Sequence, residues 1–175
     1  MHYEITTKRL LLRPLKLSDT DTVHEYASDK ENTRFMIFLP NSTVKETEDF
    51  LRGAEEEWKK DNPEFFEFAV VLDGRQIGAV SAYLDENREC AEFGWILNKR
   101  YQHNGYAFEA ALALKDFVIN ILHVKRIVAH CDARNAPSYR LMEKIGLTLE
   151  SDGAPRVYPK TGETATERTY SLNVK

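Results

Sequence analysis

The sequence has little of what marks several classes of protein. It has two cysteines, Cys90 and Cys131, which are too few for a disulfide framework, so we expect free thiols. No apolar run approaches the roughly 20 residues of a membrane-spanning helix, and the N-terminal residues lack a signal-peptide core. The formal net charge of −4 does not favour a nucleic-acid partner. We therefore expect a cytoplasmic protein that binds neither membranes nor nucleic acids.

The composition that remains is that of an ordinary globular protein. With 42% hydrophobic and 30% charged residues, the 175 residues suit one domain, 1–175, with a sizeable core. No internal repeat or low-complexity linker divides the chain.

Hydrophobic periodicity and turn residues predict the order of the elements. Strands are expected over Lys8–Arg13, which Pro14 stops, and over Phe65–Leu72, Arg75–Leu84, Glu89–Leu97, Arg126–Cys131, Leu147–Glu150 and Glu167–Val174. Helices are expected over Asp19–Ser28, Val44–Lys60, Phe108–Leu122 and from the cap Asn135 to Ile145. Asp73-Gly74 predicts a tight hairpin, and Thr43 with Glu46 forms a capping box.

This order predicts an α/β (α+β) fold class. A three-strand meander followed by βαβ-like units implies a mixed, mostly antiparallel central sheet of six to seven strands, with helices on both faces.

The segment Ala91–Ala107, AEFGWILNKRYQHNGYA, combines a strand, a small-residue turn and a helix start. Unpaired backbone N–H groups and the positive end of the helix dipole make such a turn a site for a phosphate. Gly105 and Ala107 carry no bulky side chain, so the backbone can approach an anion closely. A plain turn that packs a helix start is the alternative interpretation.

This loop resembles the acetyl-coenzyme A loop of the GNAT acyltransferases, in which Gln or Arg is followed two residues later by Gly, one residue and Gly or Ala. Here the pattern is Gln102, Gly105 and Ala107. The resemblance implies a GNAT-like fold and acetyl-CoA as the cofactor. It assigns cofactor binding to Trp95, Ile96, Leu97, Gln102, His103, Asn104, Gly105, Tyr106 and Ala107.

A second segment, NAPSYRLMEKIGL over Asn135–Leu147, is similar to the GNAT signature of the ribosomal-protein N-terminal acetyltransferase branch. Arg9–Pro14 resembles the opening strand of the same branch. The resemblance implies that Asn135 contacts the pantetheine arm and that Ser138 lies near the thioester sulfur. As residues alone, Asn135 is a helix cap and Ser138 a first-turn residue.

The chain departs from the family at the usual general acid. Many GNAT enzymes have a Tyr seven residues after the Asn, and Met142 stands there. Ser138, Tyr139 or a water must then protonate the leaving thiolate, or the thiolate leaves unassisted, since its pKa is near 8.5 in free thiols.

Glu92 is the predicted general base. It lies two residues before Gly94, so both should point to one face of the strand, and the adjacent Phe93 and Trp95 suggest an aromatic pocket that desolvates the carboxylate. An exposed Glu92 paired with a Lys or Arg is the alternative. His103 and His130 are weaker base candidates, and no second His at metal-ligand spacing indicates a metal site.

The predicted function is an N-acetyltransferase that moves an acetyl group from acetyl-CoA directly to an amine, with a protein N-terminal α-amine favoured. Small amines such as aminoglycosides, polyamines or amino acids are alternative acceptors. A non-catalytic acyl-CoA binding module is a further alternative, which Met142 favours. The apolar segment Glu31–Leu39 and the region Asp152–Thr166 are expected to shape the acceptor pocket of a monomer or homodimer.

Overall fold

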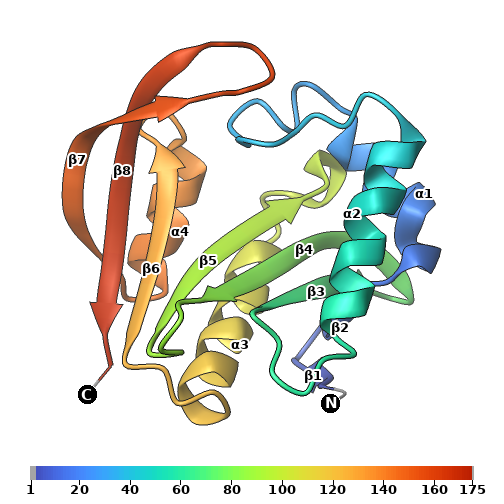
Figure 1. The fold of residues 1–175 in the computed structure, drawn as a ribbon, viewed down its shortest axis with the longest axis horizontal. Coiled ribbons are helices and arrows are strands. Elements are labelled where there is room, and N and C mark those ends of the chain that lie inside the picture. The colour runs from blue at the N-terminus through green and yellow to red at the C-terminus, as the bar shows by residue number, and fades with distance from the viewer. Residues whose placement is uncertain (1–2, 175) are drawn as a thin grey trace.

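The computed structural model describes residues 3–174, which form one eight-stranded sheet and four α-helices (Figure 1). The strands lie in the order β1-β2-β3-β4-β5-β6-β8-β7. Their bounds are β1 Ile5–Thr6, β2 Leu11–Pro14, β3 Phe65–Leu72, β4 Arg75–Leu84, β5 Cys90–Leu97, β6 Arg126–Asp132, β7 Thr148–Val157 and β8 Thr164–Asn173. The helices are α1 Thr20–Ala27, α2 Val44–Glu57, α3 Tyr106–Asn120 and α4 Ala136–Lys144.

The sheet is antiparallel except where β5 pairs with β6. That parallel pairing has four residue pairs, from Cys90 beside Arg126 to Phe93 beside Ala129, and then stops. Beyond it the two strands diverge, and Figure 1 shows the V-shaped opening between their upper ends. The carboxyl ends of two parallel strands therefore face a gap in the middle of the sheet, which is a favoured place for a ligand.

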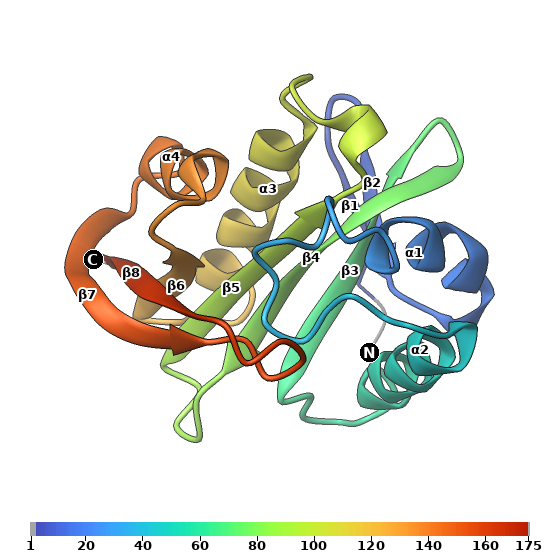
Figure 2. The ribbon, with the colours of Figure 1, turned by 90° about the horizontal axis from the view of Figure 1, so that it is seen from above.

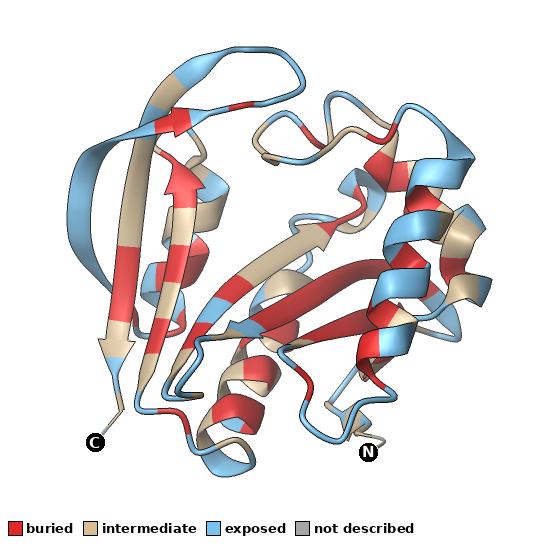
Figure 3. Cartoon of the chain, viewed as in Figure 1, coloured by how far each residue is buried: buried red, intermediate tan, exposed pale blue. Residues whose placement is uncertain are grey.

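Helices cover both faces of the sheet, as predicted (Figure 2). α3 and α4 pack on one face over a core that includes Phe66, Phe68 and Leu114. α1 and α2 pack on the other face over a smaller core with Leu51 and Ala69. Figure 1 shows α1 and α2 in front of β2, β3 and β4 but no helix in front of β6 and β8, and Figure 3 shows the buried residues gathering under the helices. On this face, β6 and β8 therefore have no helix in front of them.

The predicted N-terminal strand Lys8–Arg13 is wrong in its bounds. The chain turns there instead, because the Thr7 N–H donates to the Leu10 carbonyl (2.9 Å) and the Thr7 hydroxyl accepts from the Leu10 N–H (2.9 Å). This turn separates β1 from β2 and makes the sheet eight-stranded rather than six- or seven-stranded. Pro14 is the last residue of β2. β1 pairs only with Leu11 and Leu12, so the missing N–H of Pro14 leaves no bond to β1 unmade.

Other bounds moved for identifiable reasons. β3 and β4 match the prediction, and their turn residues Asp73 and Gly74 have φ angles of 47° and 80°, as a type I′ hairpin requires. β7 and β8 are longer than the predicted Leu147–Glu150 and Glu167–Val174. The sequence did not predict the full length of β7, because nine of its ten residues are exposed and show no apolar alternation. α3 begins two residues before Phe108 and α2 ends three residues before Lys60.

No helix within residues 3–174 is long and apolar enough to span a membrane.

Candidate functional site

The loop before α3 presents a row of unused backbone donors. Gly105 is the N-cap residue with φ 80°, and His103 has φ 64°, so the chain turns sharply into the helix. None of the backbone N–H groups from His103 to Phe108 donates to another described residue. Together with the dipole of a 15-residue helix, these donors can hold a diphosphate.

Side chains fix the shape of this loop from within. The Gln102 side-chain amide donates to the Leu97 carbonyl (3.1 Å), which ties the loop to the end of β5. The Asn104 amide donates to the carbonyls of Gln102 (2.8 Å) and Tyr101 (3.3 Å). Neither residue satisfies the free N–H groups, so the donors stay available.

Arg9 supports the loop from the first turn of the chain. Its guanidinium donates to the Asn104 carbonyl (2.9 Å), forms an ion pair with Glu109 (2.7 Å) and lies 4.5 Å from the Tyr106 ring centroid. Burial of Glu109 opposes its ionisation, whereas the hydrogen bonds from the Thr7 hydroxyl and from Arg9 favour it. The bonds outweigh the burial, so the pKa of Glu109 is lowered. The sequence motif pointed to Arg9, but only the structure shows its contact with residues about 95 positions away.

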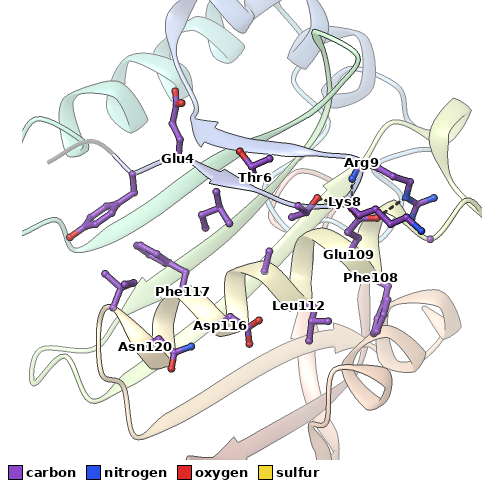
Figure 4. Close-up of a pocket in the computed structure, with 16 residues that line it drawn as sticks. Glu4, Thr6, Lys8, Arg9, Phe108, Glu109, Leu112, Asp116, Phe117 and Asn120 are labelled. Carbon is purple, nitrogen blue, oxygen red and sulfur yellow. Dashed lines mark hydrogen bonds and ion pairs between the residues drawn. The ribbon is translucent and has the colours of Figure 1, made fainter.

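A groove with a volume of about 830 Å³ runs between β1 and α3 and meets the loop at Arg9 and Gly105. Figure 4 shows the Arg9–Glu109 pair at one end and apolar side chains such as Phe108 and Phe117 along the helix.

The gap between β5 and β6 brings together two predicted site residues. The Trp95 indole N–H donates to the Ser138 hydroxyl oxygen at 3.2 Å, across 43 residues of sequence. Asn135 caps α4 as predicted, because its side-chain oxygen accepts from the Ser138 N–H (3.4 Å). The Ser138 hydroxyl also lies within hydrogen-bond reach of the Cys131 thiol, whose pKa burial raises to about 11. The Ser138 hydroxyl therefore links α4 to β5 where the pairing of β5 with β6 has ended.

The predicted cofactor residues on β5 differ in whether their side chains can reach a ligand. Ile96 packs toward the α1–α2 core, while Leu97 is buried in the core on the α3 side. Their side chains therefore belong to the interior, and only their backbone can face a ligand in the gap. Tyr106 and Ala107 are half-buried at the start of α3, whereas His103 is exposed.

Glu92 lies on the open face, but the predicted aromatic pocket is wrong. Phe93 alternates with it and is buried on the other face, and Trp95 packs there as well. The Glu92 side chain is exposed and makes no hydrogen bond or ion pair with a described residue. Glu92 and Gly94 do share one face, as predicted, so the carboxylate is one pair of residues away from the gap.

His130 is the first β6 residue beyond the last pair with β5. Its Nδ1 lies 3.0 Å from the Thr169 hydroxyl and 3.3 Å from a Glu167 carboxylate oxygen. Glu167 also pairs with Arg156 at 2.5 Å. A polar cluster therefore borders the gap on its β6 side.

The segment around Phe35 and the β7–β8 hairpin meet above the open face. The Lys160 ammonium donates to the Pro40 carbonyl (2.7 Å), and Arg156 donates to the Phe35 carbonyl (3.4 Å). Figure 2 shows these two segments side by side. Phe38 is 76% exposed at this rim.

The position of the usual family acid is occupied by Met142, which is buried in the core. Tyr139 stacks parallel to Tyr170 with 6.5 Å between ring centroids, and the Arg168 guanidinium lies 4.8 Å from its ring. Within residues 3–174, no three His, Cys, Asp or Glu side chains gather as a metal site would require.

The sequence reasoning missed Glu67, a buried carboxyl in the middle of β3. The Tyr83 hydroxyl donates a short hydrogen bond to its Oε1. Burial raises the pKa of Glu67 to about 7, against the opposing effect of that bond. A single Glu inside the apolar run FFEFAVVL was the signal that could have found it.

Comparisons with known proteins show the family of the chain. The family model described as "Acetyltransferase (GNAT) domain" matches residues 9–148. The chain belongs to the GNAT family. The uncharacterized N-acetyltransferase YnaD of Bacillus subtilis (strain 168) is 34% identical over 168 residues, which span 96% of this chain and 95% of YnaD.

Solved structures show the same GNAT fold. An acetyltransferase (GNAT family) from Bacillus anthracis matches with a TM-score of 0.84 and 30% identity over 98% of both chains. RimL, a ribosomal L7/L12 alpha-N-protein acetyltransferase solved in complex with coenzyme A, matches with a TM-score of 0.86 over 98% of both chains. At 17% identity, that second likeness concerns the fold alone.

Proposed function

We propose that this GNAT protein transfers an acetyl group from acetyl-CoA directly to an amine, with a protein N-terminal α-amine as the favoured acceptor. The observation that carries the proposal is the row of unused N–H groups from His103 to Phe108, which lies beside the gap between β5 and β6. We assign the diphosphate of acetyl-CoA to these donors and the pantetheine arm to the gap, beside Asn135. The chain 1–175 then forms one acetyltransferase domain, and a cytoplasmic location stays a prediction.

The transfer needs a neutral amine, an oxyanion site and a leaving thiolate. The amine nitrogen forms a bond to the thioester carbon, and the carbon–sulfur bond breaks as coenzyme A leaves. A backbone N–H of the Gly94–Leu97 segment stabilises the oxyanion, because a fixed donor costs no reorganisation during the reaction. The Ser138 hydroxyl accepts from Trp95, so its own O–H can donate to the thiolate. Glu92 receives the amine proton, since it is an unpaired carboxylate beside the gap.

One chemical argument and one comparison favour an α-amine as the acceptor. An α-amine has a pKa near 8 and a lysine near 10.4, so a neutral lysine at pH 7 costs about 3 kcal/mol more. The fold likeness to RimL, a ribosomal L7/L12 alpha-N-protein acetyltransferase, supports the same choice. A small amine is the alternative acceptor.

The test is a free-thiol assay with acetyl-CoA across peptides with different N-termini, polyamines, aminoglycosides and amino acids. We expect thiol release with at least one peptide α-amine and none without an acceptor. Tight binding of acetyl-CoA with no thiol release on any amine would identify a binding module instead.

A further inference from the structure

Within residues 3–174, four carboxyl groups are buried, and one of them lacks a cation. Three have a partner within 2.7 Å: Asp19 with Arg13, Glu57 with Lys60 and Asp132 with Arg134. Glu67 is only 5% exposed and forms no ion pair with a described residue. Burying an unpaired carboxylate costs free energy, so its presence needs a reason other than stability.

The sheet register connects Glu67 to the open face. Glu67 lies opposite Ser81 on β4, and Ser81 lies opposite Gly94 on β5. Tyr83, which donates to Glu67, lies opposite Glu92. Paired residues in a sheet share a face, so all five positions line one surface, which runs from the buried Glu67 to the exposed Glu92.

Tyr83 bridges the interior and the surface. It is 42% exposed, whereas Glu67 is buried. The Ser81 hydroxyl forms no hydrogen bond with a described residue, so it adds a free polar group to the same surface. A proton that reaches the Tyr83 hydroxyl from the open face can therefore pass to Glu67.

Among the described residues, no cation on the elements around Glu67 forms an ion pair with its carboxylate. From the α1 region, Tyr26 faces it, and Arg13 on the neighbouring strand β2 is already bound by Asp19. The buried α2 side chains over β3 are uncharged except for Glu57, which pairs with Lys60. From β4 and β5, Tyr83 and Glu92 face this surface. Burial and the negative charge of Glu67 raise the pKa of Tyr83, so Tyr83 stays a neutral phenol and can pass a proton on.

We propose that Glu67, reached through Tyr83, is the final acceptor of the proton that the substrate amine gives up beside Glu92. This inference rests on the proposed acetyltransferase function. The proton moves from the ammonium by way of Glu92 to the Tyr83 oxygen, while the Tyr83 O–H proton moves to the Glu67 carboxylate. The products are a neutral amine and a neutral Glu67 carboxylic acid, and no redox partner is needed. Glu67 later returns the proton to solvent along the same path.

The chemistry explains why a buried acceptor is useful. A carboxyl group with a pKa of about 7 holds a proton far more tightly than an ordinary exposed glutamate, so it is a better base for an amine whose pKa is near 8.

The test is the pH dependence of kcat/KM, with acetyl-CoA and a short peptide that has a free N-terminal amine. We expect the unmodified enzyme to show an acidic limb near pH 7. Glu67→Gln should lower kcat/KM at pH 7.5 about a hundredfold or more and remove that limb, leaving the ionisation of the amine. Tyr83→Phe should lower the rate and move any remaining limb to higher pH, because the carboxylate loses the hydroxyl that stabilises it.

Glu57→Gln is the matched control, since it removes another buried carboxylate and should leave the limb in place. An E67Q enzyme that is folded by circular dichroism and keeps both its rate and the limb overturns the relay alone. An unmodified enzyme that binds acetyl-CoA but releases no thiol with any amine overturns the proposed function and the relay with it.

Discussion

Replacing Glu67 by Gln should make the protein more stable at neutral pH. The buried carboxyl has a pKa of about 7, whereas the ordinary value is 4.5. An acid whose pKa is raised on folding stabilises the fold below pH 4.5 and loses that stabilisation as pH rises to 7, because the folded state must then bury a charge.

The size of the effect follows from the same two values. The difference between about 7 and 4.5, at roughly 1.4 kcal/mol per pH unit, amounts to about 3 kcal/mol. Gln mimics the neutral acid and does not ionise. The unfolding free energy of E67Q minus that of the unmodified protein should therefore grow by about 3 kcal/mol between pH 4.5 and pH 8.

Urea unfolding at pH 5, 6, 7 and 8 measures this difference. Glu57→Gln is the control. Burial opposes the ionisation of Glu57, but the bonds from Lys60 and the Glu64 N–H prevail and lower its pKa, so this variant should gain nothing at high pH. A difference between E67Q and the unmodified protein that is constant across the pH range contradicts the reasoning.

Four further predictions concern the cofactor loop and α4. Gly105→Asp places a carboxylate at the diphosphate donors and a side chain at φ 80°, so calorimetry should show coenzyme A binding at least tenfold weaker. Arg9→Ala frees the loop, and KM for acetyl-CoA should rise roughly fivefold to tenfold with kcat nearly unchanged; an equal fall in kcat would place Arg9 in the chemistry instead. Ser138→Ala should lower kcat while coenzyme A affinity stays close to that of the unmodified protein, and a full rate would leave Ser138 as a first-turn residue. Asn135→Ala should lower the unfolding free energy by about 1 kcal/mol through loss of the cap, and should also weaken coenzyme A binding if Asn135 contacts pantetheine.

The sequence predicted the parts of the fold that local chemistry determines. The hairpin at Asp73-Gly74 and the helix start at Thr43 came out as expected, because turn and cap residues act through their immediate neighbours. The prediction failed where the chain bonds to itself across a turn, as between Thr7 and Leu10, where a strand was expected.

The site was predictable in its backbone and less so in its side chains. The donors at Gly105 and the cap at Asn135 follow from short motifs, and the structure places both as expected. The environment of Glu92 was misjudged, because adjacent residues of a strand point to opposite faces and the aromatic neighbours therefore lie on the far side. The partner of Glu67 could not be read from the sequence, since the pairing with Tyr83 depends on strand register.

The most direct test of the central claim measures two products in one reaction. The enzyme, acetyl-CoA and a peptide with a free N-terminal amine are mixed, and the released thiol is quantified together with the mass of the peptide. The proposed direct transfer predicts one acetylated peptide for each thiol, no thiol without the peptide, and little of either product with Gly105→Asp. If the Gly105→Asp variant forms as much of both products as the unmodified enzyme at low acetyl-CoA concentration, the assignment of the cofactor to the loop before α3 is contradicted.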